Sequence, residues 1–214
     1  IDEVVSTLRG GWLATGRKVA EFERRFASRV GTRYAVAATS GTAALGLALD
    51  VLGVGRGDEV ITTPMTFVAT AHQIAVRGAK PVFVDIDPET FNVAPLRIES
   101  HITERTRALL VVHFAGRPCE MEPIRALADA HDLALVSDSA HAVESRYRNR
   151  RLAEWADIST YSFHPAKNLT TGEGGAAATD REEWAKNLNL WRFHGICGGA
   201  DARDRKGGQS GWDV

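Results

Sequence analysis

Residues 162–175, which read SFHPAKNLTTGEGG, are the segment from which the fold and the chemistry of this chain can both be approached. A strand-like run, Asp157 to Phe163, leads into a loop that holds one lysine, Lys167, and three glycines. An exposed lysine needs no such setting, whereas a lysine that must reach a bound carbonyl compound does. Catalytic lysines form a Schiff base, and desolvation or a nearby cation keeps their amine nucleophilic. Lys167 is therefore the first candidate catalytic residue.

On both sides of this segment, short runs of β-branched residues alternate with stretches in which apolar residues recur at helical spacing. The runs predict strands at Tyr34–Thr39, Val60–Thr62, Pro81–Asp85, Ala108–His113, Leu133–Asp138, Asp157–Phe163 and Gly175–Thr179. The stretches predict helices at Arg17–Val30, Ala43–Leu52, about Thr66–Val76, near Leu96, at Glu122–His131 and from Asp180 to about Trp191, and the chain begins inside a further helix. This alternation predicts an α/β fold whose mostly parallel sheet is sandwiched by helices.

Ligands of such sheets bind beyond the carboxyl ends of the strands, and Ser40-Gly41-Thr42 lies at one of them. The N-terminus of the helix that follows offers free N–H groups and a partial positive charge, Gly41 lets the backbone approach an anion, and Thr42 can donate a hydroxyl. These residues could form a phosphate cup. The alternative is a plain helix N-cap by Ser40 or Thr42.

Asp138 ends the apolar run Leu133 to Val136, and a carboxylate there needs a cationic or hydrogen-bonding partner. A pyridinium N–H would be such a partner. His141 could donate to the phenolic oxygen of the same ring. Two alternatives are a cap of the next helix and a metal site, although no third ligand follows nearby in the sequence.

Two further residues fit the same site. Phe67 follows a predicted strand and could stack on a cofactor ring, or it could be an ordinary core residue. Ser162 lies at a strand end and could complete the phosphate cup, or it could be a simple turn serine. A phosphate cup, a partner for a ring nitrogen and a lysine together predict a site for pyridoxal phosphate (PLP).

The order SGTAAL, PMTFVAT, DSAHA and SFHPAKNLTTGEGG resembles the DegT/DnrJ/EryC1/StrS aminotransferases, which are PLP enzymes acting on nucleotide-linked keto sugars. The resemblance covers nearly the whole chain and includes residues 11–16 (GWLATG) and 82–87 (VFVDID). It implies the large domain of the aspartate-aminotransferase architecture (PLP fold type I), with the smaller C-terminal domain missing. The expected divisions are an N-terminal segment and helix at 1–30, a PLP-binding large domain at 31–195, and a loop at 196–214.

The resemblance also implies a role for each site residue. Lys167 would hold the cofactor as a Schiff base and act as the catalytic base, while Asp138 would pair with the ring nitrogen. The remaining cofactor contacts would be Gly41, Thr42 and Ser162 on the phosphate, Phe67 on the ring face, and His141 near the ring oxygen. Trp12 and Thr15 would lie near the sugar.

The implied reaction moves an amino group from an amino acid, by resemblance L-glutamate, to the keto sugar. The family forms homodimers with a shared active site. A related branch of sugar dehydratases replaces the lysine by histidine, so Lys167 favours transamination. Cysteine desulfurases of the same fold need a reactive cysteine on a mobile loop, and neither Cys119 nor Cys197 has an obvious claim to that role. A catalytically silent homologue that serves as a binding module is a further alternative.

The composition fits this interpretation. The 214 residues are 44% hydrophobic and 25% charged, with 26 Lys+Arg and 27 Asp+Glu. A nucleic-acid-binding protein usually has a basic excess, and the two arginine clusters, residues 146–151 and 203–206, are expected to be solvated loops. Two cysteines form no disulfide framework, and the sequence has no apolar run of the ~18 residues that a membrane span needs. A cytoplasmic setting is the default expectation.

Overall fold

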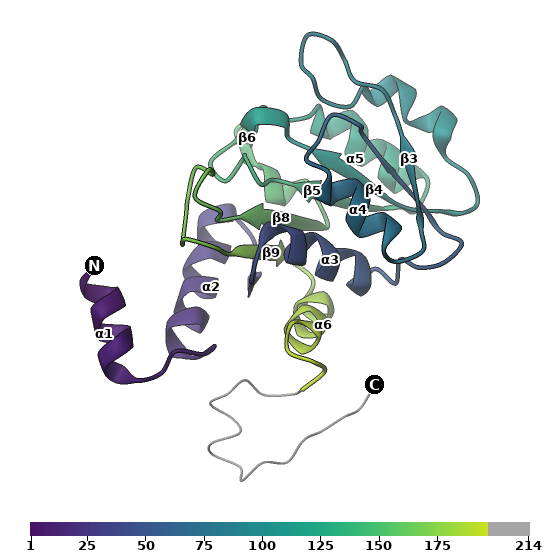
Figure 1. Cartoon of the computed structure of the whole chain (residues 1–214). Helices are drawn as coiled ribbons and strands as arrows, with labels where there is room; N and C mark the ends of the chain where they lie inside the picture. Colours follow the sequence, from purple (N-terminus) through teal and green to yellow (C-terminus); the bar gives the residue numbers. More distant parts are fainter. Residues whose placement is uncertain (197–214) are drawn as a thin grey trace.

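The computed structural model describes residues 1–196, which form a seven-stranded sheet with helices on both faces (Figure 1). The strands lie in the order β1-β9-β8-β5-β4-β2-β3. Strand β9 runs antiparallel to its neighbours β1 and β8, and the other neighbouring strands pair in parallel. The bounds are β1 Tyr34–Ala38, β2 Glu59–Thr62, β3 Lys80–Phe83, β4 Thr106–Val112, β5 Ala134–Asp138, β8 Ile158–Ser162 and β9 Gly175–Thr179. The predicted α/β fold with a mostly parallel sheet is confirmed.

The described part of the chain contains six α-helices, together with short 3-10 turns. The helices are α1 Asp2–Gly10, α2 Arg17–Val30, α3 Gly41–Val51, α4 Ala69–Ala75, α5 Met121–Ala130 and α6 Glu182–Arg192. The 3-10 turns are η1 Pro95–Arg97, η2 Glu99–His101, η3 Phe114–Gly116 and η4 Leu152–Glu154.

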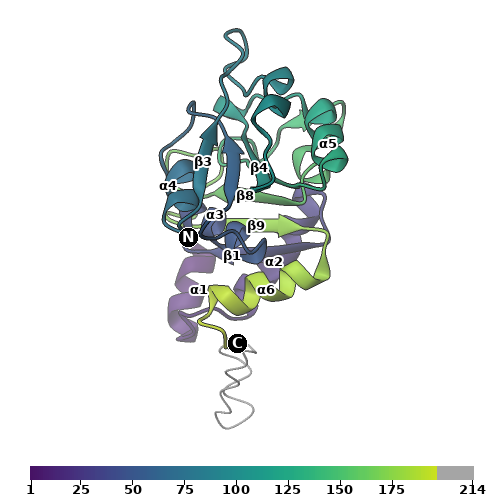
Figure 2. The same ribbon diagram turned by 90° about the vertical axis from the view of Figure 1, so that its right-hand side faces the viewer.

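The two faces of the sheet bury different sets of side chains, because successive residues of a strand point to opposite faces. On β4, Leu110 and Val112 pack in the cluster that includes residues of α3 and α4, whereas Leu109 and Val111 pack in the cluster that includes residues of α5. Figure 2 shows α4 and α5 on opposite sides of the strands. Burial on both faces explains why this strand is a continuous apolar run in the sequence.

Aromatic side chains anchor the strand that leads to Lys167. Phe163 follows β8 directly and is 1% exposed. Its ring contacts the ring of Phe26 in α2 edge to face, with 5.2 Å between the ring centroids. The ring of Tyr161 in β8 also contacts Phe26 edge to face, with 5.0 Å between the centroids. Such pairs add about 0.5–1.5 kcal/mol each beyond the area that they bury. The lysine loop therefore starts from a rigid point on the sheet.

Several boundaries differ from the sequence-based expectation. Helix α4 begins at Ala69, not near Thr66, because the backbone from residue 63 to 68 forms the loop that leads to it. The arginine cluster at 146–151, expected to be a solvated loop, is exposed or half-buried but forms an antiparallel hairpin of β6 Arg146–Tyr147 and β7 Arg150–Arg151. Residues 197–214, which include Cys197, the second arginine cluster and nearly all of the predicted C-terminal loop, lie outside the described residues.

Helix α1 stands apart from the rest of the described chain (Figure 1). It has no buried residue, and Lys18 of α2 reaches Glu3 across an exposed ion pair of 2.7 Å. Across residues 1–196, every helix is too short or too polar to traverse a lipid bilayer.

Candidate active site

A cavity of about 340 Å³ lies at the carboxyl ends of the parallel strands. It collects side chains from segments that are far apart in the sequence, as expected for this class of sheet. All seven residues predicted to bind a cofactor line it: Gly41, Thr42, Phe67, Asp138, His141, Ser162 and Lys167.

Lys167 lies in the loop after β8, where its backbone N–H donates to the carbonyl of His164 at 2.9 Å. Its Nζ lies 2.7 Å from Nε2 of His141. Burial, followed by the charge of Lys167, lowers the pKa of His141, while the charge of Asp138 opposes that shift. The imidazole is therefore neutral near pH 7, and its Nε2 can accept a hydrogen bond from the lysine ammonium, which has only donors.

Asp138 ends β5 and is 6% exposed. Its two carboxylate oxygens have different partners. Oδ1 accepts from the backbone N–H of Ala140 at 3.1 Å, and Oδ2 accepts from the hydroxyl of Thr70 at 2.9 Å. Burial raises the pKa of Asp138, whereas these two hydrogen bonds and the charges of His141 and Lys167 lower it. A buried carboxylate of this kind gains from a cationic partner inside the cavity.

The predicted phosphate cup joins two strand ends. Helix α3 starts at Gly41, and the Oγ of Ser40 accepts from the backbone N–H of Ala43 at 3.0 Å, so Ser40 is the helix N-cap. A Cβ added to Gly41 would lie 2.8 Å from Cβ of Ser162, so only glycine permits this approach. The start of α3 and Ser162 therefore face one another. Because the first N–H groups of a helix lack intrahelical partners, the junction suits an anion.

Gly175 at the start of β9 closes the back of this junction. A Cβ there would lie 2.3 Å from the carbonyl carbon of Ser40. Since β9 runs antiparallel to β1 and β8, its first residue lies at the same edge as their last residues. The close approach of three backbone segments thus shapes the cup.

Phe67 lies at the cavity wall with 72% of its surface exposed. The alternative that it is a core residue is therefore wrong. An exposed aromatic ring beside a cavity can stack on a flat ligand.

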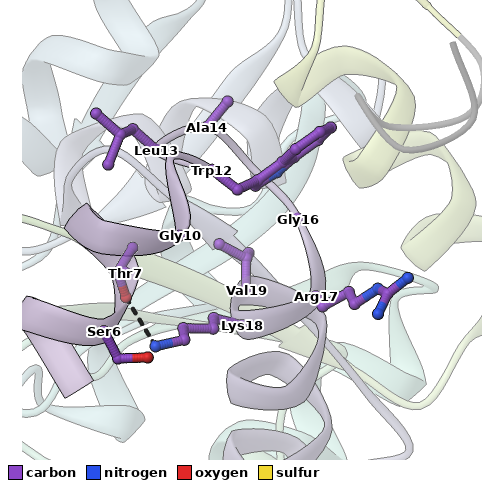
Figure 3. Close-up of a pocket in the computed structure, with 10 residues that line it drawn as sticks. All are labelled: Ser6, Thr7, Gly10, Trp12, Leu13, Ala14, Gly16, Arg17, Lys18 and Val19. Carbon is purple, nitrogen blue, oxygen red and sulfur yellow. Dashed lines mark hydrogen bonds between the residues drawn. The ribbon is translucent and has the colours of Figure 1, made fainter. Parts of the chain in front are cut away.

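Trp12 and Thr15 do not line this cavity. Trp12 lines a separate groove between α1 and α2, which Figure 3 shows together with the hydrogen bond from Lys18 to Thr7. Its indole nitrogen lies 3.3 Å from the carbonyl oxygen of Thr15. In this chain the structure does not bring either residue to the cofactor cavity, so their contact with a sugar stays a prediction.

His113 is a cavity residue that sequence reasoning did not select. It is 1% exposed, and its Nδ1 accepts from the backbone N–H of Cys119 at 3.2 Å. Burial lowers the pKa of His113 to about 3, so the ring is neutral and carries its proton on Nε2. That nitrogen has no hydrogen-bond partner among the described residues. The position directly after β4 is the signal that could have identified it.

Other polar residues at the site were also not predicted from the sequence. Thr66, His164 and Glu173 line the cavity, and Thr70 lies behind Asp138. His164 and Glu173 approach one another to 3.9 Å. Cys119 is fully buried, and burial raises the pKa of its thiol to about 12, which makes it unreactive. Within residues 1–196, no group of three or more His, Cys, Asp or Glu side chains could hold a metal ion.

Relatives of known sequence match along the whole chain. The family model of the DegT/DnrJ/EryC1/StrS aminotransferase family matches residues 1–211. The chain is 46% identical over 214 residues to the spore coat polysaccharide biosynthesis protein SpsC of Bacillus subtilis, a match that covers 100% of the chain and 55% of SpsC. The chain thus spans about half the length of the curated relatives it matches.

Solved structures agree with this match. DesV of S. venezuelae, in complex with a ketimine intermediate, has a TM-score of 0.88 at 40% identity over 92% of this chain and 53% of DesV. The putative sugar aminotransferase Spr1654 from Streptococcus pneumoniae, in its PLP form, has a TM-score of 0.88 at 38% identity over 93% of this chain and 56% of its own. Spr1654 has also been solved in a PMP form.

The cofactor predicted from the sequence is thus the one found with solved relatives. The predicted large-domain architecture is confirmed as well, because these relatives share the α/β fold. The family model covers far more than half of the chain, and its sequence relatives agree. The chain therefore belongs to the DegT/DnrJ/EryC1/StrS aminotransferase family.

Proposed function

We propose that this chain carries the PLP site of an enzyme that transfers an amino group from L-glutamate to a nucleotide-linked keto sugar. One observation carries the proposal: the amine of Lys167, the carboxylate of Asp138 and the junction of Gly41 with Ser162 meet at one cavity. These are the three chemical functions that PLP needs from a protein, namely an amine for its carbonyl, an anion for its ring nitrogen and donors for its phosphate.

The residues present fit this cofactor. Asp138 is a buried carboxylate without a cation of its own at hydrogen-bond distance among the described residues, and a protonated ring nitrogen would be its counter-ion. Gly41, Thr42 and Ser162 would hold the phosphate at the start of α3. Phe67 would cover one face of the ring. The N–H at Nε2 of His113 is a buried donor that still needs an acceptor, and a polar ligand or a water in the cavity would supply one.

The cofactor would supply a carbonyl group that condenses with amines and a ring that accepts electrons. Lys167 would hold it covalently in the resting enzyme and would be released when the amino donor takes its place. The free amine of Lys167 would then move a proton between the α-carbon of the donor and C4′ of the cofactor, acting as base and then as acid. Neutral His141, 2.7 Å away, would accept a hydrogen bond from that amine and keep it oriented.

The nature of the acceptor rests on relatives. SpsC is named for the biosynthesis of a spore coat polysaccharide, and Spr1654 is described as a putative sugar aminotransferase. A keto sugar is therefore the substrate class that we propose, with Trp12 and Thr15 as its contacts. A nucleotide carrier, glutamate as the donor, a homodimer with a shared site and a cytoplasmic location complete the proposal.

The test follows the amine of Lys167. The protein, at its full encoded length, is mixed with PLP, its visible spectrum is recorded, and borohydride is added before peptide mass spectrometry. We expect a visible band that borohydride removes, and a phosphopyridoxyl group on the peptide that holds Lys167. Lys167→Ala should lose the adduct and transamination, yet still bind the cofactor without a covalent bond.

Lys186→Ala is the matched control, because Lys186 is exposed on α6 and, among residues 1–196, its ion pair is with Glu182. It should behave as wild type. A folded protein with no band and no adduct would refute the proposed cofactor site and favour a binding module. An adduct together with loss of a sugar hydroxyl, and no amino transfer, would favour a dehydratase. Normal turnover in Lys167→Ala would exclude the catalytic role.

A further inference from the structure

The carboxylate of Asp138 is held from behind by a side chain that does not line the cavity. Thr70 lies in α4 and is fully buried at 0% exposure. Its hydroxyl donates to Oδ2 of Asp138 at 2.9 Å across a separation of 68 residues. The residues that line the cavity do not include Thr70. Any effect of this hydroxyl on bound cofactor would therefore pass through its two hydrogen-bond partners, Asp138 and Thr66.

The hydrogen bonds around Thr70 have a defined direction. A carboxylate accepts only, so the single proton of the Thr70 hydroxyl is used on Asp138. Oγ1 of Thr66 lies 2.8 Å from Oγ1 of Thr70, and it must therefore donate to Thr70. If Asp138 were protonated, its own O–H could donate to Thr70 and the chain could run the opposite way. The order Thr66 to Thr70 to Asp138 is thus the order that favours an ionised carboxylate.

The carboxylate has few other donors. Oδ1 has the backbone N–H of Ala140, and Thr70 is the one side chain in residues 1–196 with a described hydrogen bond to the carboxylate. Lys167 makes no described hydrogen bond to the carboxylate, and its positive charge lowers the pKa of Asp138. Burial acts in the opposite direction and favours the neutral form. Loss of the Thr70 hydroxyl would leave one carboxylate oxygen buried without its donor, which is costly.

We infer that Thr70 is a positioning residue, which holds Asp138 ionised and in one orientation for the ring nitrogen of the cofactor, with Thr66 setting the direction of its hydroxyl. This inference rests on the proposed PLP site. Its consequence is that the anion exists before the cofactor arrives. Cofactor binding then needs neither a proton transfer from Asp138 nor a change of its side-chain rotamer.

The experiment compares wild type with Thr70→Val, which keeps the branched shape and removes the hydroxyl, and with Thr70→Ser, which restores it. Thr66→Val removes the donor behind Thr70 and serves as a second, less buried variant, at a position that itself lines the cavity. Each apoprotein is titrated with PLP between pH 5 and pH 9, and the dissociation constant is measured from the visible band. Thermal unfolding of each apoprotein confirms that it is folded.

The affinity of the wild-type protein for PLP should fall as the pH is lowered and Asp138 takes up a proton. In Thr70→Val the dissociation constant at pH 7 should rise at least about tenfold, because hydrogen bonds to charged groups are among the strongest in proteins. The midpoint of the acid limb should move to higher pH. Thr66→Val should shift the dissociation constant and the midpoint of the acid limb in the same direction by less. Thr70→Ser should restore both quantities to their wild-type values.

Other ionisable groups lie at the cavity, so the variants must separate them from Asp138. His141 and Lys167 face the carboxylate, and His113, His164 and Glu173 also line the cavity. None of these residues is changed in the four proteins, so a shift of the acid limb that follows the Thr70 hydroxyl belongs to Asp138.

A second probe makes the test specific. An analogue of PLP with carbon in place of the ring nitrogen has no N–H to offer Asp138. If Thr70 acts through Asp138, Thr70→Val should weaken PLP far more than this analogue. Equal weakening of both, or an unmoved acid limb in folded Thr70→Val and Thr66→Val, would overturn the inference and leave the PLP site intact. Absence of PLP binding in wild type would instead refute the proposed function, and the inference with it.

Discussion

Replacement of Gly175 by alanine tests the backbone contact that shapes the proposed phosphate cup. The added methyl group would lie 2.3 Å from the carbonyl carbon and the carbonyl oxygen of Ser40, and 2.6 Å from the backbone nitrogen of Gly41. Comfortable carbon contacts begin near ~3.5 Å, so the two backbones must separate by about 1 Å. All three contacted atoms belong to the main chain, so no side chain can turn away to make room.

The expected cost follows from overpacking a filled site, which is typically ~1–3 kcal/mol. For a protein of this size, each kcal/mol lowers the melting temperature by roughly 2–4 °C. The Gly175→Ala protein should therefore melt roughly 2–12 °C lower. The same displacement moves Ser40 and Gly41 relative to Ser162, so affinity for the phosphate group should fall too.

The assay measures the melting temperature and two dissociation constants, for PLP and for pyridoxal, which lacks the phosphate. Gly175→Ala should weaken PLP more than pyridoxal. Gly55→Ala is the matched control, because a Cβ at Gly55 meets no atom within 4 Å. If Gly175→Ala melts like Gly55→Ala and still prefers PLP as strongly as wild type, the close approach of β9 to the start of α3 has no energetic weight and the reasoning fails.

Three further predictions concern single residues of the site. Asp138→Asn should keep the fold and reduce turnover strongly, and an unchanged rate would exclude the ring-nitrogen role. Burial raises the folded pKa of Asp138 above its unfolded value, so the wild-type apoprotein loses stability as the pH rises from the unfolded value of about 4 through the folded pKa. The melting temperature of Asp138→Asn, measured by differential scanning fluorimetry, should therefore gain on wild type as the pH rises over that range. Phe67→Ala should leave the melting temperature within about 1 °C, since the ring is exposed, and should weaken PLP by roughly tenfold if the ring stacks on it; a strong loss of stability would contradict this placement. Trp12→Ala should raise KM for the sugar and leave PLP affinity unchanged, and the reverse pattern in steady-state kinetics would remove Trp12 from the sugar site.

The parts of the fold that follow from periodicity were predictable. Helix α2 lies at Arg17–Val30 and strand β9 at Gly175–Thr179, within the bounds expected from the sequence. Lys167 and Asp138 were identifiable for the same reason, because each follows or ends an apolar run whose carboxyl end marks the binding edge of the sheet.

Helix α4 shows where apolar periodicity misleads. Phe67 and Val68 extend the apolar pattern, so the helix was expected to begin near Thr66 and Phe67 could be a core residue. In the structure these two side chains are 72% and 67% exposed and precede the helix. An apolar residue beside a cavity can be exposed because it contacts a ligand there. The pattern of apolar residues in a sequence carries no information about such a ligand.

Thr70 could not be found from the sequence at all. A threonine inside a helix has no signal of its own, and its importance comes from the proximity of α4 to the end of β5. The clustering of Ser40, Gly41 and Gly175 also depends on the fold and has no local sequence signal. The glycines were visible in the sequence, but the atoms that they approach were not.

The reversed strand β9 also has a consequence for synthesis on the ribosome. Strand β1 lies at one edge of the sheet, where its one strand partner among residues 1–196 is β9, with Tyr34 opposite Thr179. Its partner leaves the ribosome about 140 residues later, so β1 has no strand to pair with while the intervening residues are made. Pairings that are so distant in sequence form slowly. The two halves of the phosphate cup can therefore meet only after β9 has entered between β1 and β8, which makes cofactor capture one of the last events in the maturation of this domain.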